Sequence, residues 1–306
     1  MAVTPPAATT NDKPAPDLAD VPYGLHERHR IDFWKARADK PAPIVVFFHG
    51  GGFYRGDKNL LPPNILSMCQ DAGFAVAAVN YRLSVEVTYP AYMLDSARAV
   101  QFIRSQAGQW NIDASRVAAC GGSAGAGISL WLGFHDDLAR PDSPDVVARQ
   151  SSRLTCMGLR NAQCSYDPHF YRQAGLAPAN NHPFMPLFYG RPVSQMGTPQ
   201  ARRMATEAAG ITYFHAGGPP VFLYYSSPDD PLPYDDTPVG PKSDETDMYD
   251  ADPVSSRAVH HPEMGRIMKR RLDELRVECE LHVNVADRVA QVEADMVEFF
   301  KRHLLS

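Results

Sequence analysis

Short apolar runs that alternate with amphipathic segments constrain this 306-residue chain more than any other feature. Residues 43–48 (PIVVFF) and 74–80 (FAVAAVN) are continuous apolar runs, the pattern of strands buried on both faces. Between and after these runs, apolar residues recur at helical spacing. Strands that alternate with helices in this way predict an α/β fold: a mostly parallel central sheet with helices on both faces.

The alternation continues to the C-terminus. Further strands are expected at 116–120, 154–159, 221–225 and 277–285, and a weaker edge-strand pattern lies at 26–34. Helices are expected at 64–72, 92–106, 124–138, 262–275 and 289–305.

Three segments interrupt the pattern. Residues 1–20 are rich in proline, alanine and threonine, and we interpret them as a flexible tail before one domain at 21–306. Residues 165–218 are expected to form a cap-like insertion, which either walls a substrate pocket or packs under a long loop. Residues 228–255 hold nine acidic residues against one lysine, which indicates a solvated loop. A calcium site is the alternative there, although the spacing matches no EF-hand.

Composition excludes several classes of function. The net charge of −5 argues against nucleic-acid binding and against binding to an anionic membrane. The apolar runs are far shorter than the roughly 18 residues of a membrane span. The five cysteines are scattered and include no CxxC pair, so they indicate no metal site. No secretory signal is visible, so we expect a cytoplasmic protein, although a signal removed earlier would leave the same sequence. We expect a monomer or homodimer.

The strongest chemical signal is the segment GGSAG at 121–125, which fits G-x-S-x-G between a predicted strand and a predicted helix. A turn this sharp strains the serine backbone and requires small neighbours, and it exposes the hydroxyl above the sheet. The helix N-terminus behind the serine offers positive potential to a developing oxyanion. Ser123 is therefore the candidate nucleophile.

A second signal is HGGGF at 49–53, directly after the strand at 43–48. Consecutive glycines after a buried strand let main-chain N–H groups face a ligand, as an oxyanion hole needs, together with the N–H of Ala124. His49 lies at the end of the strand, where its ring is expected to brace the glycine loop rather than act as a base.

The segments HGGGF, NYRL at 80–83 and GGSAGAG at 121–127, in this order, resemble the hormone-sensitive-lipase-like α/β-hydrolases and the related BD-FAE-like esterases. The resemblance covers residues 24–165 well and the C-terminal half more loosely. It implies an α/β-hydrolase fold and ester hydrolysis through an acyl-enzyme, with no cofactor and no metal. It also places the oxyanion hole at Gly51, Gly52 and Ala124.

The resemblance implies an acid after the strand at 221–225, which runs into SSPDDPLP. The D-x-x-apolar-P pattern of the family selects Asp229, whereas a rarer D-P-L pattern would select Asp230. We prefer Asp229.

The base is where the chain departs from the family, which places a histidine just after the last strand. Here residues 285–288 read VADR, and His282 lies within the strand itself, from which it cannot easily reach the serine. The pair His260 and His261 keeps the chain order serine, acid, histidine. We hypothesise that this pair supplies a relocated base, with a slight preference for His261. The alternative is that the pair only caps the following helix and leaves catalysis impaired.

These observations predict a serine carboxylesterase acting on small acyl or carbohydrate and plant-wall-type esters, with a small-molecule ester as its partner. The alternative is a ligand-binding pseudo-hydrolase that lacks an effective catalytic histidine.

Overall fold

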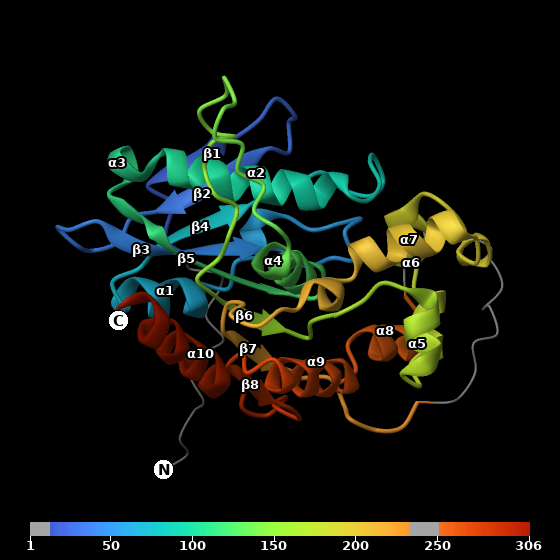
Figure 1. The fold of residues 1–306 in the computed structure, drawn as a ribbon. Helices are drawn as coiled ribbons and strands as arrows, with labels where there is room; N and C mark the ends of the chain where they lie inside the picture. The colour runs from blue at the N-terminus through green and yellow to red at the C-terminus, as the bar shows by residue number, and fades with distance from the viewer. Residues whose placement is uncertain (1–12, 233–250) are drawn as a thin grey trace, which may run out of the picture.

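A computed structural model describes residues 13–232 and 251–306 of the chain (Figure 1). In these residues one sheet has the strand order β1-β2-β4-β3-β5-β6-β7-β8. The strands β1 and β2 run antiparallel to their neighbours, and the strands from β4 to β8 are parallel. The predicted mostly parallel sheet is confirmed.

The elements have the following bounds. The strands are β1 Leu18–Pro22, β2 Arg30–Trp34, β3 Ala42–Phe48, β4 Ala75–Val79, β5 Ile112–Gly122, β6 Cys156–Arg160, β7 Val221–Tyr224 and β8 Cys279–His282. The helices are α1 Pro63–Asp71, α2 Ala91–Ser105, α3 Ala107–Trp110, α4 Ala124–Phe134, α5 Pro168–Gln173, α6 Phe184–Tyr189, α7 Pro199–Ala208, α8 Pro253–Val259, α9 Glu263–Glu274 and α10 Val289–Leu304. Short 3₁₀ turns are η1 Lys58–Leu60, η2 Ala177–Asn181, η3 Val193–Gln195 and η4 Gly210–Tyr213.

Both faces of the sheet are apolar because its central strands alternate their buried side chains between two clusters. In β3, for example, Ile44 and Val46 pack in one cluster and Val45 and Phe47 in the other. The first cluster includes residues of α2, α4 and α9, and the second includes residues of α1 and α10. Helices therefore cover both faces, as the sequence predicts (Figure 1).

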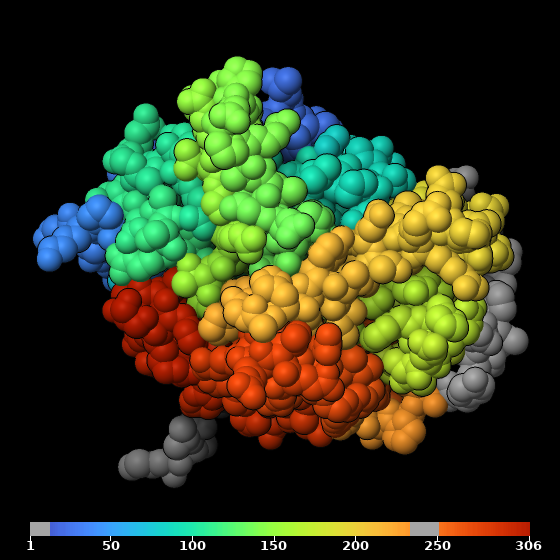
Figure 2. Space-filling model, viewed as in Figure 1, coloured from blue at the N-terminus to red at the C-terminus, as the bar shows by residue number. Residues whose placement is uncertain are grey.

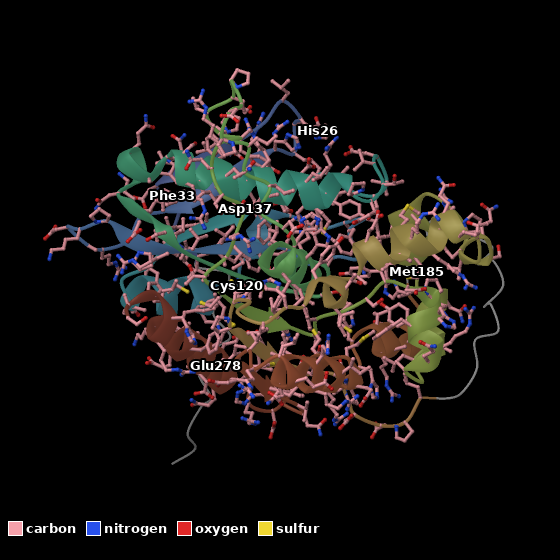
Figure 3. All side chains as sticks on the ribbon, in the orientation of Figure 1. His26, Phe33, Cys120, Asp137, Met185 and Glu278 are labelled. Atoms are coloured by element: carbon pink, nitrogen blue, oxygen red, sulfur yellow. The ribbon has the colours of Figure 1, made fainter. Side chains whose placement is uncertain are left out.

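The segment 165–218 is helical and lies beyond the carboxyl ends of the parallel strands, at the right of Figure 1. Its helices α5 and α7 begin at prolines that follow the N-caps Asp167 and Thr198. Met185 and Phe188 are fully buried, so the packing of this cap is continuous with the main core (Figure 3). In the space-filling view the cap forms a rounded lobe beside the C-terminal helices (Figure 2).

The structure corrects the sequence analysis at the N-terminal edge. Residues 18–20, assigned to the flexible tail, belong to β1, which pairs with β2. Consequently β2 is the second strand and not the edge. β1 has no buried side chain, so its pairing leaves no apolar pattern in the sequence. The rest of the tail, 1–12, and most of the acidic loop, 233–250, lie outside the described residues.

Within residues 13–232 and 251–306, no helix combines the length and the apolar character that crossing a bilayer requires.

The end of β3 lies in close contact with the start of α4. A Cβ built on Gly125 would overlap the carbonyl oxygen of Phe48, and a Cβ on Gly121 would approach the same oxygen. Glycine is required at both positions because main chain, rather than a flexible side chain, occupies the space. This contact fixes the turn at Ser123 relative to the loop that follows β3.

We predict that Gly125→Ala lowers the free energy of unfolding by about 1–3 kcal/mol or more, because the new methyl group overlaps a main-chain carbonyl. Urea unfolding followed by circular dichroism measures the change. Gly108→Ala is the matched control, since a Cβ there meets no atom within 4 Å. A loss no larger for Gly125→Ala than for Gly108→Ala contradicts the contact.

Candidate active site

Ser123 occupies a strained turn between β5 and α4. Its backbone has φ 52° and ψ −119°, a conformation that costs an L-residue on the order of 1–3 kcal/mol. Its N–H donates to the carbonyl of Arg160 at the end of β6, at 2.9 Å, and its carbonyl accepts from Gly127 N–H at 3.0 Å. These bonds hold the hydroxyl at the mouth of two pockets.

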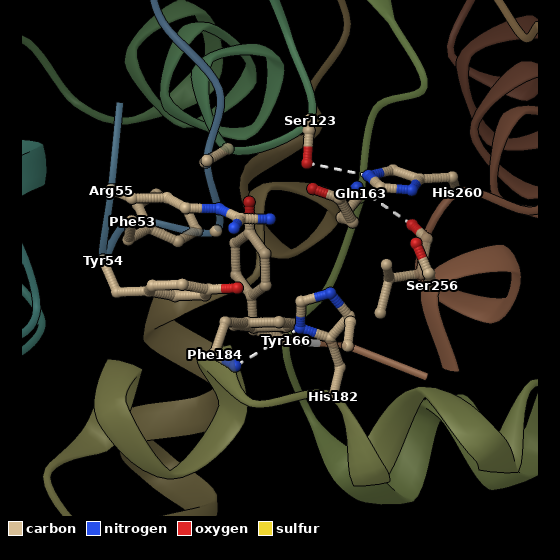
Figure 4. Close-up of a pocket in the computed structure, with 15 residues that line it drawn as sticks. Phe53, Tyr54, Arg55, Ser123, Gln163, Tyr166, His182, Phe184, Ser256 and His260 are labelled. Atoms are coloured by element: carbon tan, nitrogen blue, oxygen red, sulfur yellow. Dashed lines mark hydrogen bonds between the residues drawn. The ribbon is translucent and has the colours of Figure 1, made fainter. Parts of the chain in front are cut away.

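His260 lies at hydrogen-bond distance from the serine. Its Nε2 is 2.8 Å from Ser123 Oγ (Figure 4). A hydrogen bond from the ring to the main-chain carbonyl of Ser256 acts to raise the pKa of His260, and with Nε2 at the serine this bond falls to Nδ1. A donating Nδ1 leaves the lone pair of Nε2 for the serine hydroxyl, the tautomer that a general base requires.

The helix α8 holds His260 in this position. The side chain of Asp252 caps the helix by accepting from the N–H groups of Val254 and Ser255, each at 2.9 Å. At the other end, Gln163 Nε2 donates to the carbonyl of Val259, the residue before His260, at 2.9 Å. His260 is therefore anchored to the loop after β6. The sequence analysis missed α8, although an aspartate followed by proline is a helix-start signal.

His261 lies elsewhere, which corrects the preference for this residue over His260. Its Nε2 is 3.3 Å from the carbonyl oxygen of Asp230, and its Nδ1 accepts from the N–H of Glu263 at 3.1 Å. The second bond caps the start of α9, so His261 has the capping role that was the alternative for the pair. Successive side chains point in different directions, and only one of the two rings can face Ser123.

Asp229 forms a different pair from the one expected. Its carboxylate forms an ion pair with the guanidinium of Arg266 in α9, and Arg266 Nη1 donates to Asp229 Oδ1 at 2.9 Å. This contact makes the largest contribution to lowering the pKa of the Asp229 carboxyl below its usual value. Asp230 is exposed and lies 4.0 Å from Arg257. Neither aspartate bonds to His260. The structure therefore differs from the expected pairing of Asp229 with the histidine.

The segment after β8, where the family places its histidine, does not reach the pockets at Ser123. None of residues 283–288 lines either pocket at Ser123. His282 stacks on Phe222, with ring centroids 4.7 Å apart. In the described part of the chain, no group of three or more His, Cys, Asp or Glu side chains is arranged to hold a metal ion.

The predicted oxyanion-hole residues gather beside the serine. Gly51, Gly52 and Ala124 all line one pocket with Ser123. Gly51 and Gly52 have φ of 109° and 59°, the left-handed region that favours glycine, which explains the consecutive glycines. Ala124 is the first residue of α4, so its N–H is free of the helical ladder.

His49 braces this loop, as expected, and does not contact Ser123. Its Nδ1 lies 2.8 Å from the carbonyl oxygen of Gly50, and its ring stacks on Tyr81 with centroids 4.2 Å apart. The ring is fully buried, and this burial lowers the pKa of His49 to about 4.

The pocket on the cap side of Ser123, here called the cap pocket, has a volume of about 440 Å³. The cap contributes Tyr166, His182 and Phe184, so the segment that was expected either to wall a pocket or to pack does both (Figure 4). The sequence analysis did not single out His182. A lone histidine carries no chemical signal before the fold places it opposite His260.

Burial lowers the pKa of His260 to about 4, and the positive charge of Arg160 acts in the same direction. The bond to the Ser256 carbonyl opposes this shift only in part. The ring is therefore neutral, and able to accept a proton, over the whole physiological range of pH.

Comparisons with known proteins show which family the chain resembles. The BD-FAE family model matches residues 32–239, more than half of the chain. Esterase LipQ of Mycobacterium tuberculosis is 24% identical over 228 residues, 72% of this chain and 50% of LipQ. The chain thus spans about half the length of this curated relative.

Solved structures show the same fold. A truncated carbohydrate esterase from gut microbiota superposes with a TM-score of 0.70 at 16% identity, covering 97% of this chain and 99% of that one. An acetyl ester-xyloside bifunctional hydrolase from Caldicellulosiruptor lactoaceticus gives 0.66 at 20% identity, covering 96% and 93%. These likenesses confirm the α/β-hydrolase fold.

We predict that His49 couples stability to pH. Its pKa is about 4 in the folded chain, against 6.5 as its ordinary value, so its contribution is present above pH 6.5 and lost as the pH falls towards 4. Between pH 7.5 and pH 5.0 the linked loss is about 2 kcal/mol. In His49→Gln the difference in urea unfolding free energy between these two pH values should shrink by this amount. An unchanged difference contradicts a buried neutral ring.

Proposed function

Because this chain belongs to the BD-FAE family, we propose that it is a serine carboxylesterase with Ser123 as nucleophile and His260 as base. The observation that carries the proposal is the 2.8 Å approach of His260 Nε2 to Ser123 Oγ at a strained strand-to-helix turn. The esterase name of the relative LipQ supports the same reaction class.

In the proposed mechanism the ester carbonyl enters the cap pocket, and Ser123 Oγ attacks its carbon while His260 Nε2 takes the hydroxyl proton. The negative charge that develops on the carbonyl oxygen is stabilised by the N–H groups of Gly51, Gly52 and Ala124. His260 then gives the proton to the departing alkoxide. Water then attacks the acyl-enzyme with His260 again as base. The carboxylic acid is released and free Ser123 is regenerated.

The proposed base has a neutral orienting partner. The Ser256 carbonyl selects the correct tautomer of His260, which is one of the two roles of a triad carboxylate. It carries no full charge, so it stabilises the imidazolium formed during acylation less than a carboxylate would. We therefore expect a working but moderate esterase, rather than one with the full rate of a charged triad.

We further propose that the substrates are small acyl esters or esters of carbohydrates. The cap pocket, at about 440 Å³, suits a ligand of this size. The carbohydrate class comes by analogy with the names of the two proteins of similar fold.

The test is hydrolysis of p-nitrophenyl butyrate by the purified protein, with Ser123→Ala as blank. Sustained release above the blank supports a complete site. A burst equal to the enzyme concentration, followed by no turnover, means that the serine is acylated but not released.

The second candidate is the ligand-binding pseudo-hydrolase. One observation favours it: within residues 13–232 and 251–306, no carboxylate contacts His260. Absence of turnover in the same assay, together with binding of the intact ester to the wild-type protein by calorimetry, would support this candidate over the esterase.

We predict that His260→Ala lowers kcat/KM for p-nitrophenyl butyrate by about a hundredfold or more, because a general base typically contributes 10²–10⁴. The matched control is His261→Ala, the neighbouring histidine. His261→Ala should lower stability by about 1 kcal/mol through loss of a cap, while kcat/KM stays within a few-fold. Equal losses of kcat/KM in the two variants contradict the assignment.

Asp229→Asn serves as a second control in the same assay. Removal of a true triad acid costs about 10⁴ in kcat, so a loss that large in this variant would reinstate Asp229 as the acid. The ion pair with Arg266 predicts instead a loss of stability with a loss of turnover under tenfold.

We predict an acidic limb of the pH profile well below pH 6.5. The base must be neutral, and the pKa of His260 is about 4, so kcat/KM should keep most of its plateau value at pH 5 and fall through pH 4. The measurement follows p-nitrophenol release at its isosbestic wavelength. A midpoint near 6.5 would show that the ring is hydrated and not buried as described.

A further inference from the structure

A second pocket opens on the other side of Ser123, between the carboxyl ends of β5, β6 and β7 and the helices α1 and α10. We call it the sheet-end pocket, and its volume is about 310 Å³. Ser123 and His260 line it, as they line the cap pocket. A substrate with its ester carbon at Ser123 can therefore extend one end into each pocket.

The wall of the sheet-end pocket is mostly apolar, with residues such as Phe47, Ile65 and Met296. Arg160, the last residue of β6, is the cation in this lining. Its side chain passes beside Gly122, where a built Cβ would lie 3.9 Å from Arg160 Cδ. The pairing of β5 with β6 therefore places the stem of the Arg160 side chain beside Gly122, the residue before Ser123.

The guanidinium of Arg160 has spare hydrogen-bonding capacity. Its hydrogen bond in the described structure goes from Nη2 to Ser226 Oγ at 3.3 Å, out of five N–H groups that guanidinium carries. Among residues 13–232 and 251–306, no carboxylate lies within ion-pair distance of it.

The sheet-end pocket also contains a carboxylate, Glu293, which has hydrogen-bond partners of its own. Glu293 of α10 is buried and accepts from Tyr224 Oη at 3.1 Å and from Asn64 Nδ2 at 2.5 Å. These bonds give each carboxylate oxygen of Glu293 a donor, and within residues 13–232 and 251–306 Glu293 forms no ion pair with Arg160. The guanidinium of a residue that lines a mostly apolar pocket together with Ser123 is a matched partner for a carboxylate.

We propose that the sheet-end pocket binds a carboxylate group of the ester substrate, with the guanidinium of Arg160 as its ion-pair partner. The inference rests on the proposed esterase function and narrows it to esters that carry a free carboxylate on one side of the ester bond. The pocket fits a short chain of a few carbons between the two groups.

The charges at the site favour such a substrate during the reaction as well. Acylation turns His260 into an imidazolium, and the positive charge of Arg160 disfavours this ion. A carboxylate bound to Arg160 cancels part of this repulsion. The anionic group should therefore raise kcat as well as lower KM.

The test compares each anionic ester with its neutral amide isostere in a pH-stat. Monoethyl succinate against ethyl succinamate places the carboxylate on the acyl side, and 4-acetoxybenzoate against 4-acetoxybenzamide places it on the alcohol side. For one pair, kcat/KM of the wild-type protein should favour the acid by about tenfold or more, as expected for hydrogen bonds to a charged group. In Arg160→Met this ratio should fall close to one, and Arg160→Lys should restore part of it.

Arg55→Met is the matched control, because Arg55 lines the cap pocket and not the sheet-end pocket. Its ratio should stay at the wild-type value. Loss of the ratio in Arg55→Met but not in Arg160→Met places the carboxylate in the cap pocket and overturns the proposal. The proposal is also overturned if neither pair shows a preference for the acid over the amide while the neutral esters are hydrolysed. That outcome leaves the esterase function intact.

A binding measurement decides the matter without turnover. Calorimetry measures Kd for the preferred acid in Ser123→Ala and in the double variant Ser123→Ala, Arg160→Met. If no ester is hydrolysed, Kd is measured for both acids. An increase of about tenfold in Kd supports the proposal. Equal affinity overturns it, whether or not the wild-type protein hydrolyses esters.

Discussion

The site depends on one close contact between main-chain segments, where the carbonyl of Phe48 at the end of β3 meets Gly121 of β5 and Gly125 of α4. This contact leaves no room for side chains, and it forces Ser123 into a left-handed conformation above the sheet. It also sets the glycine loop after β3 beside the same serine. The proposed nucleophile and the proposed oxyanion hole therefore depend on one packing constraint, and both rely mainly on backbone geometry.

His260 comes from a part of the chain that takes no part in this contact. Helix α8 carries His260 to the serine, and its anchors are the cap at Asp252 and the bond from Gln163 to the Val259 carbonyl. The acid expected after β7 is used for structure instead, because Asp229 pairs with Arg266 and so ties that loop to α9. The ring of His260 keeps a neutral carbonyl as its partner, which orients it without lending it charge.

Two pockets meet at Ser123, and their walls differ in character. The cap supplies aromatic residues and His182 to one, whereas the sheet and α10 supply apolar residues and Arg160 to the other. The segment after β8 lines neither pocket. The proposed base thus comes from the end of α8, and a second pocket with Arg160 in its lining lies beside the strand ends.

The sequence by itself determined the layered fold, the serine turn and the glycine loop, because each is written in contiguous residues: apolar runs such as 43–48, GGSAG and HGGGF. It narrowed the base to two adjacent histidines. Only the tertiary structure decided that His260 faces Ser123, that His261 caps α9, and that Asp229 binds Arg266. It also added β1, whose side chains are only partly buried or exposed and leave no apolar pattern. The physical reason is common to these cases: they depend on contacts between residues distant in the chain, or on the direction in which one side chain points, and neither is encoded in local spacing.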